Sequence, residues 1–109
     1  MKGKIVLIPF PFTDLTSAKL RPALVLYQGK YDLILAFISS QTTVQRTECE
    51  IYLQKDTPEF LSSGLKMDSV IRLDKIATVL NDLVIAELGE LDISYRNELN
   101  RKISSLLQL

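Results

Sequence analysis

The chain has no histidine and no tryptophan, and its single cysteine is Cys49. Histidine is the side chain that most often serves as a general base near neutral pH, and most zinc-site patterns also need it. A lone cysteine excludes an internal disulfide. Any chemistry must therefore come from arginine, lysine, hydroxyl groups or carboxylates, and we expect neither a metal nor a cofactor.

The chain also lacks an excess of either charge and any long apolar stretch. The chain has 13 Lys and Arg against 13 Asp and Glu. This balance argues against a surface that attracts nucleic acid over its whole area, but it leaves room for a local basic patch. No apolar stretch approaches the ~20 residues that cross a bilayer, and the pattern after residues 1–4 is too short for a signal-peptide core. We therefore expect a cytoplasmic protein with no membrane contact.

The 109 residues predict one domain, 1–109, large enough to bury a core without disulfides. Short apolar runs bounded by turn residues are typical of strands. A connection of three residues, 28–30, indicates that the second and third strands form an antiparallel hairpin. The predicted strands are 5–8, 23–27, 31–38, 48–53 with Cys49 as a small filler, 69–78 with a bend near Asp74, and 83–88 ended by Gly89.

The remaining segments predict a loop and a terminal helix. Residues 55–66 read as a loop with a helical turn around 59–61 and a tight turn at Gly64. Asp92 is a suitable N-cap for an amphipathic helix. Its apolar stripe is Tyr95, Leu99, Ile103, Leu106 and Leu107, and the charged residues Arg96, Glu98, Arg101 and Lys102 are expected on a solvated surface.

The stretch around Arg21 is the most informative part of the chain. Arg21 is followed by Pro22 and then by the apolar run 23–26. Because Pro22 favours an extended backbone before it and lacks an amide donor, we expect the strand to begin after it and Arg21 to lie just outside. A permanent charge at the mouth of a core strand is not needed for packing, and it suits recognition of an anion.

Ser39 ends the third predicted strand, so the hairpin would place it at the same rim as Arg21. A guanidinium can bind phosphate oxygens bidentately, and a neighbouring hydroxyl can donate to the same group. The pair suits phosphodiester transesterification, in which positioning and electrostatics supply most of the catalysis. A structural explanation is also open, in which Arg21 pairs with a surface carboxylate and Ser39 only ends a strand.

Several stretches, in order, resemble the MazF/PemK family of toxins from type II toxin–antitoxin systems. They are residues 3–7 (GKIVL), 20–26 (LRPALVL), 38–41 (ISSQ), 64–70 (GLKMDSV), 74–78 (DKIAT) and 88–91 (LGEL). The resemblance covers nearly the whole chain. It implies a mainly β (α+β) fold, an SH3-like small barrel of antiparallel strands with a C-terminal amphipathic helix, as in the MazF/PemK and CcdB-like superfamily.

The resemblance also implies an activity, namely metal-independent cleavage of single-stranded RNA (an mRNA interferase). The substrate's own 2′-hydroxyl would attack, leaving a 2′,3′-cyclic phosphate and a 5′-hydroxyl. Arg21 matches the catalytic arginine of the family, and Ser39 matches the residue that holds the scissile phosphate. Because a guanidinium stays protonated at neutral pH, arginine is a poor general base, and the identity of the base stays open. The implied partners are a cognate antitoxin and a second copy of the chain in a homodimer.

Further substrate contacts are indicated around this pair. They are Thr16, Ser17, Lys19, Ser40, Gln41, Thr42 and Ser69. Strand-end polarity explains Gln41 and Thr42 equally well, and a turn cap explains Ser69.

The chain departs from the family in two places. Residues 15–19 (LTSAK) replace a common Gly-Ser-Glu-Gln stretch and lack its acid, and Lys75 and Ala77 stand where Gln and Arg are common. Two other functions stay open. Gyrase-poisoning toxins of the same fold use a tryptophan near the C-terminus, which is absent here, and a noncatalytic barrel would bind nucleic acid or a peptide.

Overall fold

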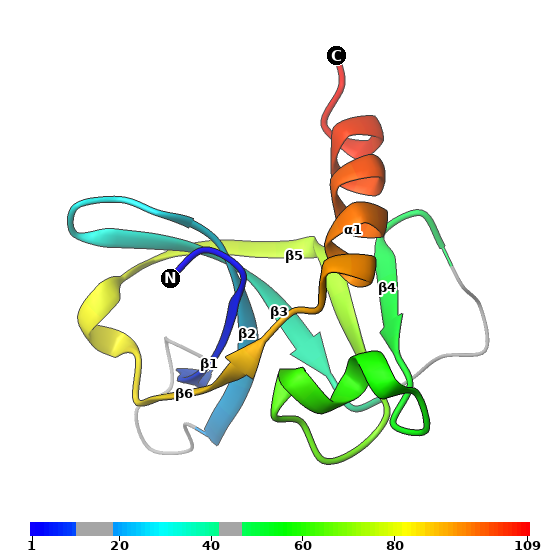
Figure 1. The fold of residues 1–109 in the computed structure, drawn as a ribbon. Helices are drawn as coiled ribbons and strands as arrows, with labels where there is room; N and C mark the ends of the chain where they lie inside the picture. The colour runs from blue at the N-terminus through cyan, green and yellow to red at the C-terminus, as the bar shows by residue number, and fades with distance from the viewer. Residues whose placement is uncertain (11–18, 42–46) are drawn as a thin grey trace.

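The computed structural model describes residues 1–10, 19–41 and 47–109, and it contains one six-stranded antiparallel sheet (Figure 1). The strand order is β4-β5-β3-β2-β1-β6. The mainly β fold with a C-terminal helix confirms the predicted class. The elements are β1 Lys4–Phe10, β2 Lys19–Gln28, β3 Asp32–Ser39, β4 Glu50–Leu53, the 3-10 helix η1 Pro58–Ser63, β5 Ser69–Leu80, the 3-10 helix η2 Asn81–Leu83, β6 Ala86–Glu90 and α1 Ile93–Leu106.

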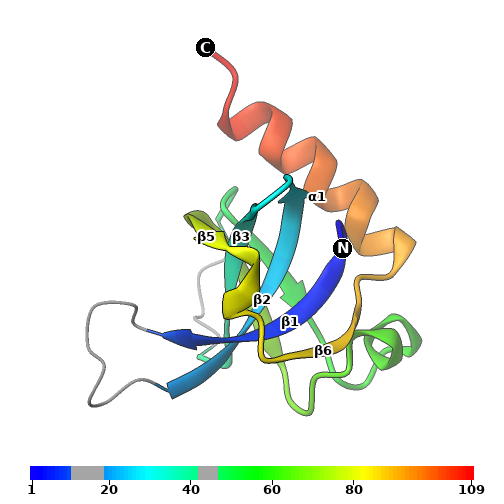
Figure 2. The same cartoon turned by 90° about the vertical axis from the view of Figure 1, so that its left-hand side faces the viewer.

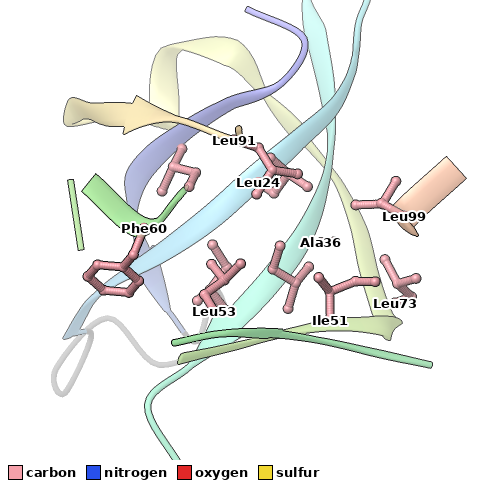
Figure 3. Close-up of a cluster of buried hydrophobic side chains, with 11 residues drawn as sticks. Leu24, Ala36, Ile51, Leu53, Phe60, Leu73, Leu91 and Leu99 are labelled. Atoms are coloured by element: carbon pink, nitrogen blue, oxygen red, sulfur yellow. The ribbon is translucent and has the colours of Figure 1, made fainter. Parts of the chain in front are cut away.

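Both faces of the curled sheet are buried, because successive side chains of a strand point to opposite faces. Ile5 and Leu24 belong to one apolar cluster, which η1 and α1 cover with Phe60 and Leu99 (Figure 3). Their neighbours, such as Val6, belong to a second cluster on the other face. The second cluster consists of Val6, Ile8, Ala23, Val25, Leu33, Leu35 and Val79, with Phe37, Ala77, Leu83 and Val84 packed against it.

The β2–β3 hairpin is confirmed, and so is the bend near Asp74. In the pairing of β3 with β5, Ala36 lies opposite Ile76 but the next residue, Phe37, lies opposite Arg72. Residues 73–75 of β5 therefore form a bulge. A bulge bends a strand and redirects its side chains, and this one places Asp74 at the surface of the sheet.

Most strand boundaries differ from the prediction by one to four residues, and β6 and β4 show the reason. β6 runs from Ala86 to Glu90 and not over 83–88, because η2 takes up 81–83 and β6 pairs with β1, with Gly89 opposite Ile5. Gly89 is thus inside the strand and does not end it. β4 begins at Glu50, and Cys49 lies half-buried in the turn before it. The ends of these two strands depend on their pairing with distant strands, which the local composition does not reveal.

The predicted helical turn before Gly64 is confirmed as η1. Gly64 follows it with a φ of 74°, in the left-handed region that favours glycine. A Cβ at this position would lie 2.0 Å from the carbonyl oxygen of Leu88 in β6. The turn therefore depends on a residue without a side chain, which lets η1 pack directly on β6.

The terminal helix begins as predicted, because the Asp92 side chain accepts a hydrogen bond from the Ser94 amide at 3.0 Å. Leu99 is its buried residue, and α1 stands over one end of the sheet beside β4 (Figure 1). The prediction that Lys102 lies on a solvated surface is wrong, because this side chain donates to the Glu50 carbonyl oxygen at 2.8 Å and pairs with Glu98. It is also wrong for Arg96, which donates to the Leu91 carbonyl oxygen. No helix in the described ranges is long and apolar enough to span a membrane.

Candidate active site

The hairpin register brings Arg21 and Ser39 to the same rim of the sheet. Ala23 of β2 lies opposite Phe37 of β3. Two residues further towards the open end of the hairpin, the same register puts Arg21 level with Ser39. Both residues line one cleft of about 560 Å³, so the structure brings together the two side chains that the sequence pattern paired.

The cleft lies over β1, β2, β3 and the bulge of β5. Its floor is aromatic and aliphatic, since Phe10 and Phe37 pack with ring centroids 5.0 Å apart. Its polar groups come from the strand ends and from the bulge. The described residues that line it are Phe10, Arg21, Phe37, Ile38, Ser39, Ser40, Gln41, Arg72, Asp74, Lys75 and Ile76.

Arg21 lies inside β2, so the prediction that it stands outside the strand is wrong. β2 begins at Lys19 and runs beside β1 (Figure 2). Arg21 pairs with Ile8 of β1. Pro22 is tolerated there because pairing with β3 starts only at Ala23, and proline is found where a strand lacks a neighbour. Arg21 is exposed, and within the described ranges no carboxylate lies within ion-pair distance of it. None of the described carboxylates therefore competes with an anion in the cleft for this guanidinium.

Ser39 is held by the turn that follows it. Its Oγ accepts a hydrogen bond from the Gln41 amide at 3.0 Å. An accepting hydroxyl keeps its own proton to donate, so Ser39 can bind an anionic oxygen without breaking this turn. Ser40 and Gln41 follow at the rim and are exposed.

An ion cluster of Arg72 and Asp74 on β5 with Glu50 on β4 was not predicted from the sequence, and its β5 members line the cleft. Arg72 binds Asp74 through two hydrogen bonds, Nε to Oδ1 at 3.1 Å and Nη2 to Oδ2 at 3.0 Å. Behind it, Oε2 of the buried Glu50 lies 4.0 Å from the Arg72 Nε. The hydrogen bond from Arg72 lowers the pKa of Asp74, which is therefore ionised at neutral pH. In the sequence, only one feature could have indicated this cluster, namely two opposite charges that lie two residues apart in an apolar strand.

The other predicted substrate residues are placed differently. Lys19 begins β2 and is exposed, opposite Phe10, but it is not among the residues that line the cleft. Ser69 is 4% exposed, and its hydroxyl donates to the Met67 carbonyl oxygen at 2.8 Å, as a turn cap does. Thr16, Ser17 and Thr42 lie outside the described residues. In the part of the chain that the structure describes, no group of three or more His, Cys, Asp or Glu is arranged to hold a metal.

Residues 1–107 match the family model of the PemK-like, MazF-like toxins of type II toxin–antitoxin systems. The chain belongs to this family. Because the match spans nearly all of the chain, the resemblance seen in the six short stretches of sequence is confirmed. No curated protein matches the chain.

Solved structures of MazF proteins have the same fold. The Mycobacterium tuberculosis toxin MazF-mt6 is 22% identical with a TM-score of 0.71, and the alignment covers 97% of each chain. A MazE–MazF structure from Deinococcus radiodurans gives 20% identity and a TM-score of 0.74, covering 99% of this chain and 95% of the other. An endoribonuclease in complex with its cognate antitoxin from Mycobacterial species is 16% identical with a TM-score of 0.73, and the alignment covers 100% of this chain and 95% of the other.

Proposed function

We propose that this toxin is a metal-independent endoribonuclease that cleaves single-stranded RNA. The observation that carries the proposal is the meeting of Arg21 and Ser39 at one cleft, in a chain of the MazF-like family. The similar structures from Mycobacterial species are described as endoribonucleases, which supports the same activity here.

In the proposed reaction the 2′-oxygen of the substrate forms a bond to phosphorus, and the bond from phosphorus to the 5′-oxygen breaks. The products are a 2′,3′-cyclic phosphate and a 5′-hydroxyl. One proton leaves the 2′-hydroxyl, and one is returned to the 5′-oxygen. Arg21 stabilises the charge that builds on the phosphoryl oxygens, and Ser39 donates a hydrogen bond to one of them. The general base is not assigned.

The proposed regulator is a cognate antitoxin. The Deinococcus and Mycobacterial structures described above contain MazF with MazE and an endoribonuclease with its antitoxin. An acidic or apolar segment of the antitoxin lying across the cleft would neutralise Arg21 and block the phosphate site. Because its substrate is mRNA, we propose that the toxin acts in the cytoplasm.

We also propose that the toxin is a homodimer. The end of α1 does not cover the barrel, since Leu107 and Leu109 are exposed and the C-terminus projects away from the sheet (Figure 1). Apolar side chains gathered at an exposed helix end are typical of an interface. Light scattering coupled to gel filtration should give twice the chain mass of 12.3 kDa. A mass of one chain at micromolar concentration would contradict the dimer.

Replacing Ser39 with alanine should lower the rate of RNA cleavage roughly 10- to 100-fold, the usual effect of losing one hydrogen bond to a charged group. Ser39→Thr keeps the hydroxyl and serves as the matched control, with a rate near that of the unmodified toxin. Single-turnover kinetics on one defined RNA measure both. Equal rates for the alanine and threonine variants would remove Ser39 from the proposed mechanism.

Cleavage in the presence of EDTA tests the proposed function itself. The purified toxin is incubated with a long single-stranded RNA, and the new ends are mapped chemically. Cyclic phosphate ends support the proposal. RNA binding without cleavage, or gyrase inhibition without cleavage, would replace it with one of the two other functions.

A further inference from the structure

The ion cluster of Arg72, Asp74 and Glu50 has no part in the proposed phosphate chemistry, although Arg72 and Asp74 line the same cleft as Arg21. The bulge of β5 turns them towards it. A guanidinium has five N–H donors. Asp74 accepts one from Nε and one from Nη2, which leaves the outer edge formed by Nη1 and Nη2 with two parallel donors for a ligand.

The surrounding charge decides what kind of ligand this edge accepts. Arg72 contributes one positive charge, whereas Asp74 and Glu50 contribute two negative charges within 4.0 Å of it. Charges this close interact by several kcal/mol at the effective dielectric constant of about 20 near a protein surface. With Lys75, which lines the same cleft and acts on Asp74, the local charges sum to zero, so this edge has little net attraction for a phosphate. Arg21, which lacks such a carboxylate among the described residues, is the better phosphate site. The Arg72 edge suits a neutral group with two adjacent acceptors.

We infer that the outer edge of Arg72 is a nucleobase subsite for a base with two adjacent acceptor atoms, and that it selects the RNA sequence to be cut. This inference rests on the proposed endoribonuclease function. Guanine offers O6 and N7, and cytosine offers N3 and O2, edges that are accessible in single-stranded RNA. Adenine and uracil place a donor beside each acceptor on these edges, so they cannot satisfy both N–H groups of Arg72.

The cluster is built to hold this edge still. Glu50 is 4% exposed, and its Oε1 accepts from the amide and the hydroxyl of Thr47. Its Oε2 lies 4.0 Å from the Arg72 Nε, and Asp74 accepts two hydrogen bonds from the guanidinium. A rigid donor pair loses little conformational entropy on binding, and this is the property that makes arginine selective at bidentate sites.

The test is a cleavage map of a random RNA pool, read from its 5′-hydroxyl ends. The unmodified toxin should favour guanine or cytosine at one fixed distance from the cut, by roughly 10- to 100-fold over adenine and uracil. Arg72→Lys keeps the charge opposite Glu50 but lacks the fork, so it should cleave with that preference lost. Arg101→Lys, on the exposed face of α1, is the matched control and should keep the preference.

Two further measurements keep the test decisive if the Arg72 variant folds poorly. The unmodified toxin should cut the selected site less well when the RNA carries 7-deazaguanine, or 3-deazacytosine for a cytosine site, because each removes one acceptor. The slowly cleaving Arg21→Ala variant should bind short oligonucleotides with one central guanine or cytosine more tightly than those with adenine or uracil. A preference for adenine or uracil, no preference, or one unchanged in Arg72→Lys would overturn the inference.

The outcomes also separate this inference from the proposed function. If the unmodified toxin cleaves no RNA at all, the proposed function fails, and the oligonucleotide binding still reports on the subsite. If it cleaves with no preference that depends on Arg72, the function stands and the subsite fails.

Discussion

Replacing Arg21 with alanine should reduce the single-turnover rate of RNA cleavage by roughly a thousandfold, the range seen when a charge-stabilising donor is removed from a transition state. Among the described residues Arg21 and Lys75 are the cations of the cleft that no carboxylate pairs with, and Arg21 is the one level with Ser39. Arg72 is held by two carboxylates and cannot substitute for it. In the variant, the charge on the phosphoryl oxygens would be stabilised only by the Ser39 hydroxyl and by the single ammonium of Lys75.

The substitution Arg21→Lys separates charge from geometry. Lysine keeps the positive charge but supplies a single ammonium in place of the planar fork. We therefore expect it to recover little of the lost rate. Arg21 is exposed, so thermal unfolding of both variants should stay close to that of the unmodified toxin. Near-normal cleavage by Arg21→Ala would contradict the proposed mechanism.

Replacing Gly64 with alanine should give the largest loss of stability among single methyl additions. The φ of 74° costs an L-residue about 1–2 kcal/mol, and forcing a Cβ against the Leu88 carbonyl adds about 1–3 kcal/mol. We expect a melting temperature lower by roughly 15 °C, since about 1 kcal/mol corresponds to roughly 4–8 °C in a domain of this size. Differential scanning calorimetry measures it.

Gly3 provides the matched control. It also has a positive φ, 87°, but the atoms nearest to an added Cβ belong to the guanidinium of Arg96, a flexible side-chain end that can move aside. Gly3→Ala should therefore cost only the backbone strain. If both variants melt at the same temperature, direct packing of η1 on β6 does not contribute as described.

The hairpin and the meeting of Arg21 with Ser39 were predictable because they follow from local rules. Three residues between two apolar runs fix an antiparallel pair, and the two-residue period of a strand then fixes which side chains share a rim. Arg21 and Ser39 are level for this reason. The cap at Asp92 and the left-handed turn at Gly64 are equally local, since each depends on the chemistry of one residue.

The ion cluster was not predictable in the same way. The sequence shows Arg72 and Asp74 as alternating charges on a strand, which is typical of a solvated face. Only the three-residue bulge in the pairing of β3 with β5 turns them into the cleft, and only the pairing of β4 with β5 brings Glu50 behind Arg72. The limits of β6 depend likewise on its pairing with β1. These contacts join residues far apart in the chain, and no local pattern reports them.

The attack of the substrate's own 2′-hydroxyl is the central claim, and one measurement tests it most directly. A defined RNA containing one cleavage site is compared, in EDTA, with the same RNA carrying a single 2′-deoxynucleotide on the 5′ side of the scissile phosphate. The all-ribose RNA should be cut to a 2′,3′-cyclic phosphate and a 5′-hydroxyl, and the substituted RNA should stay intact at that bond. Cleavage of the substituted RNA at the same bond would contradict the account.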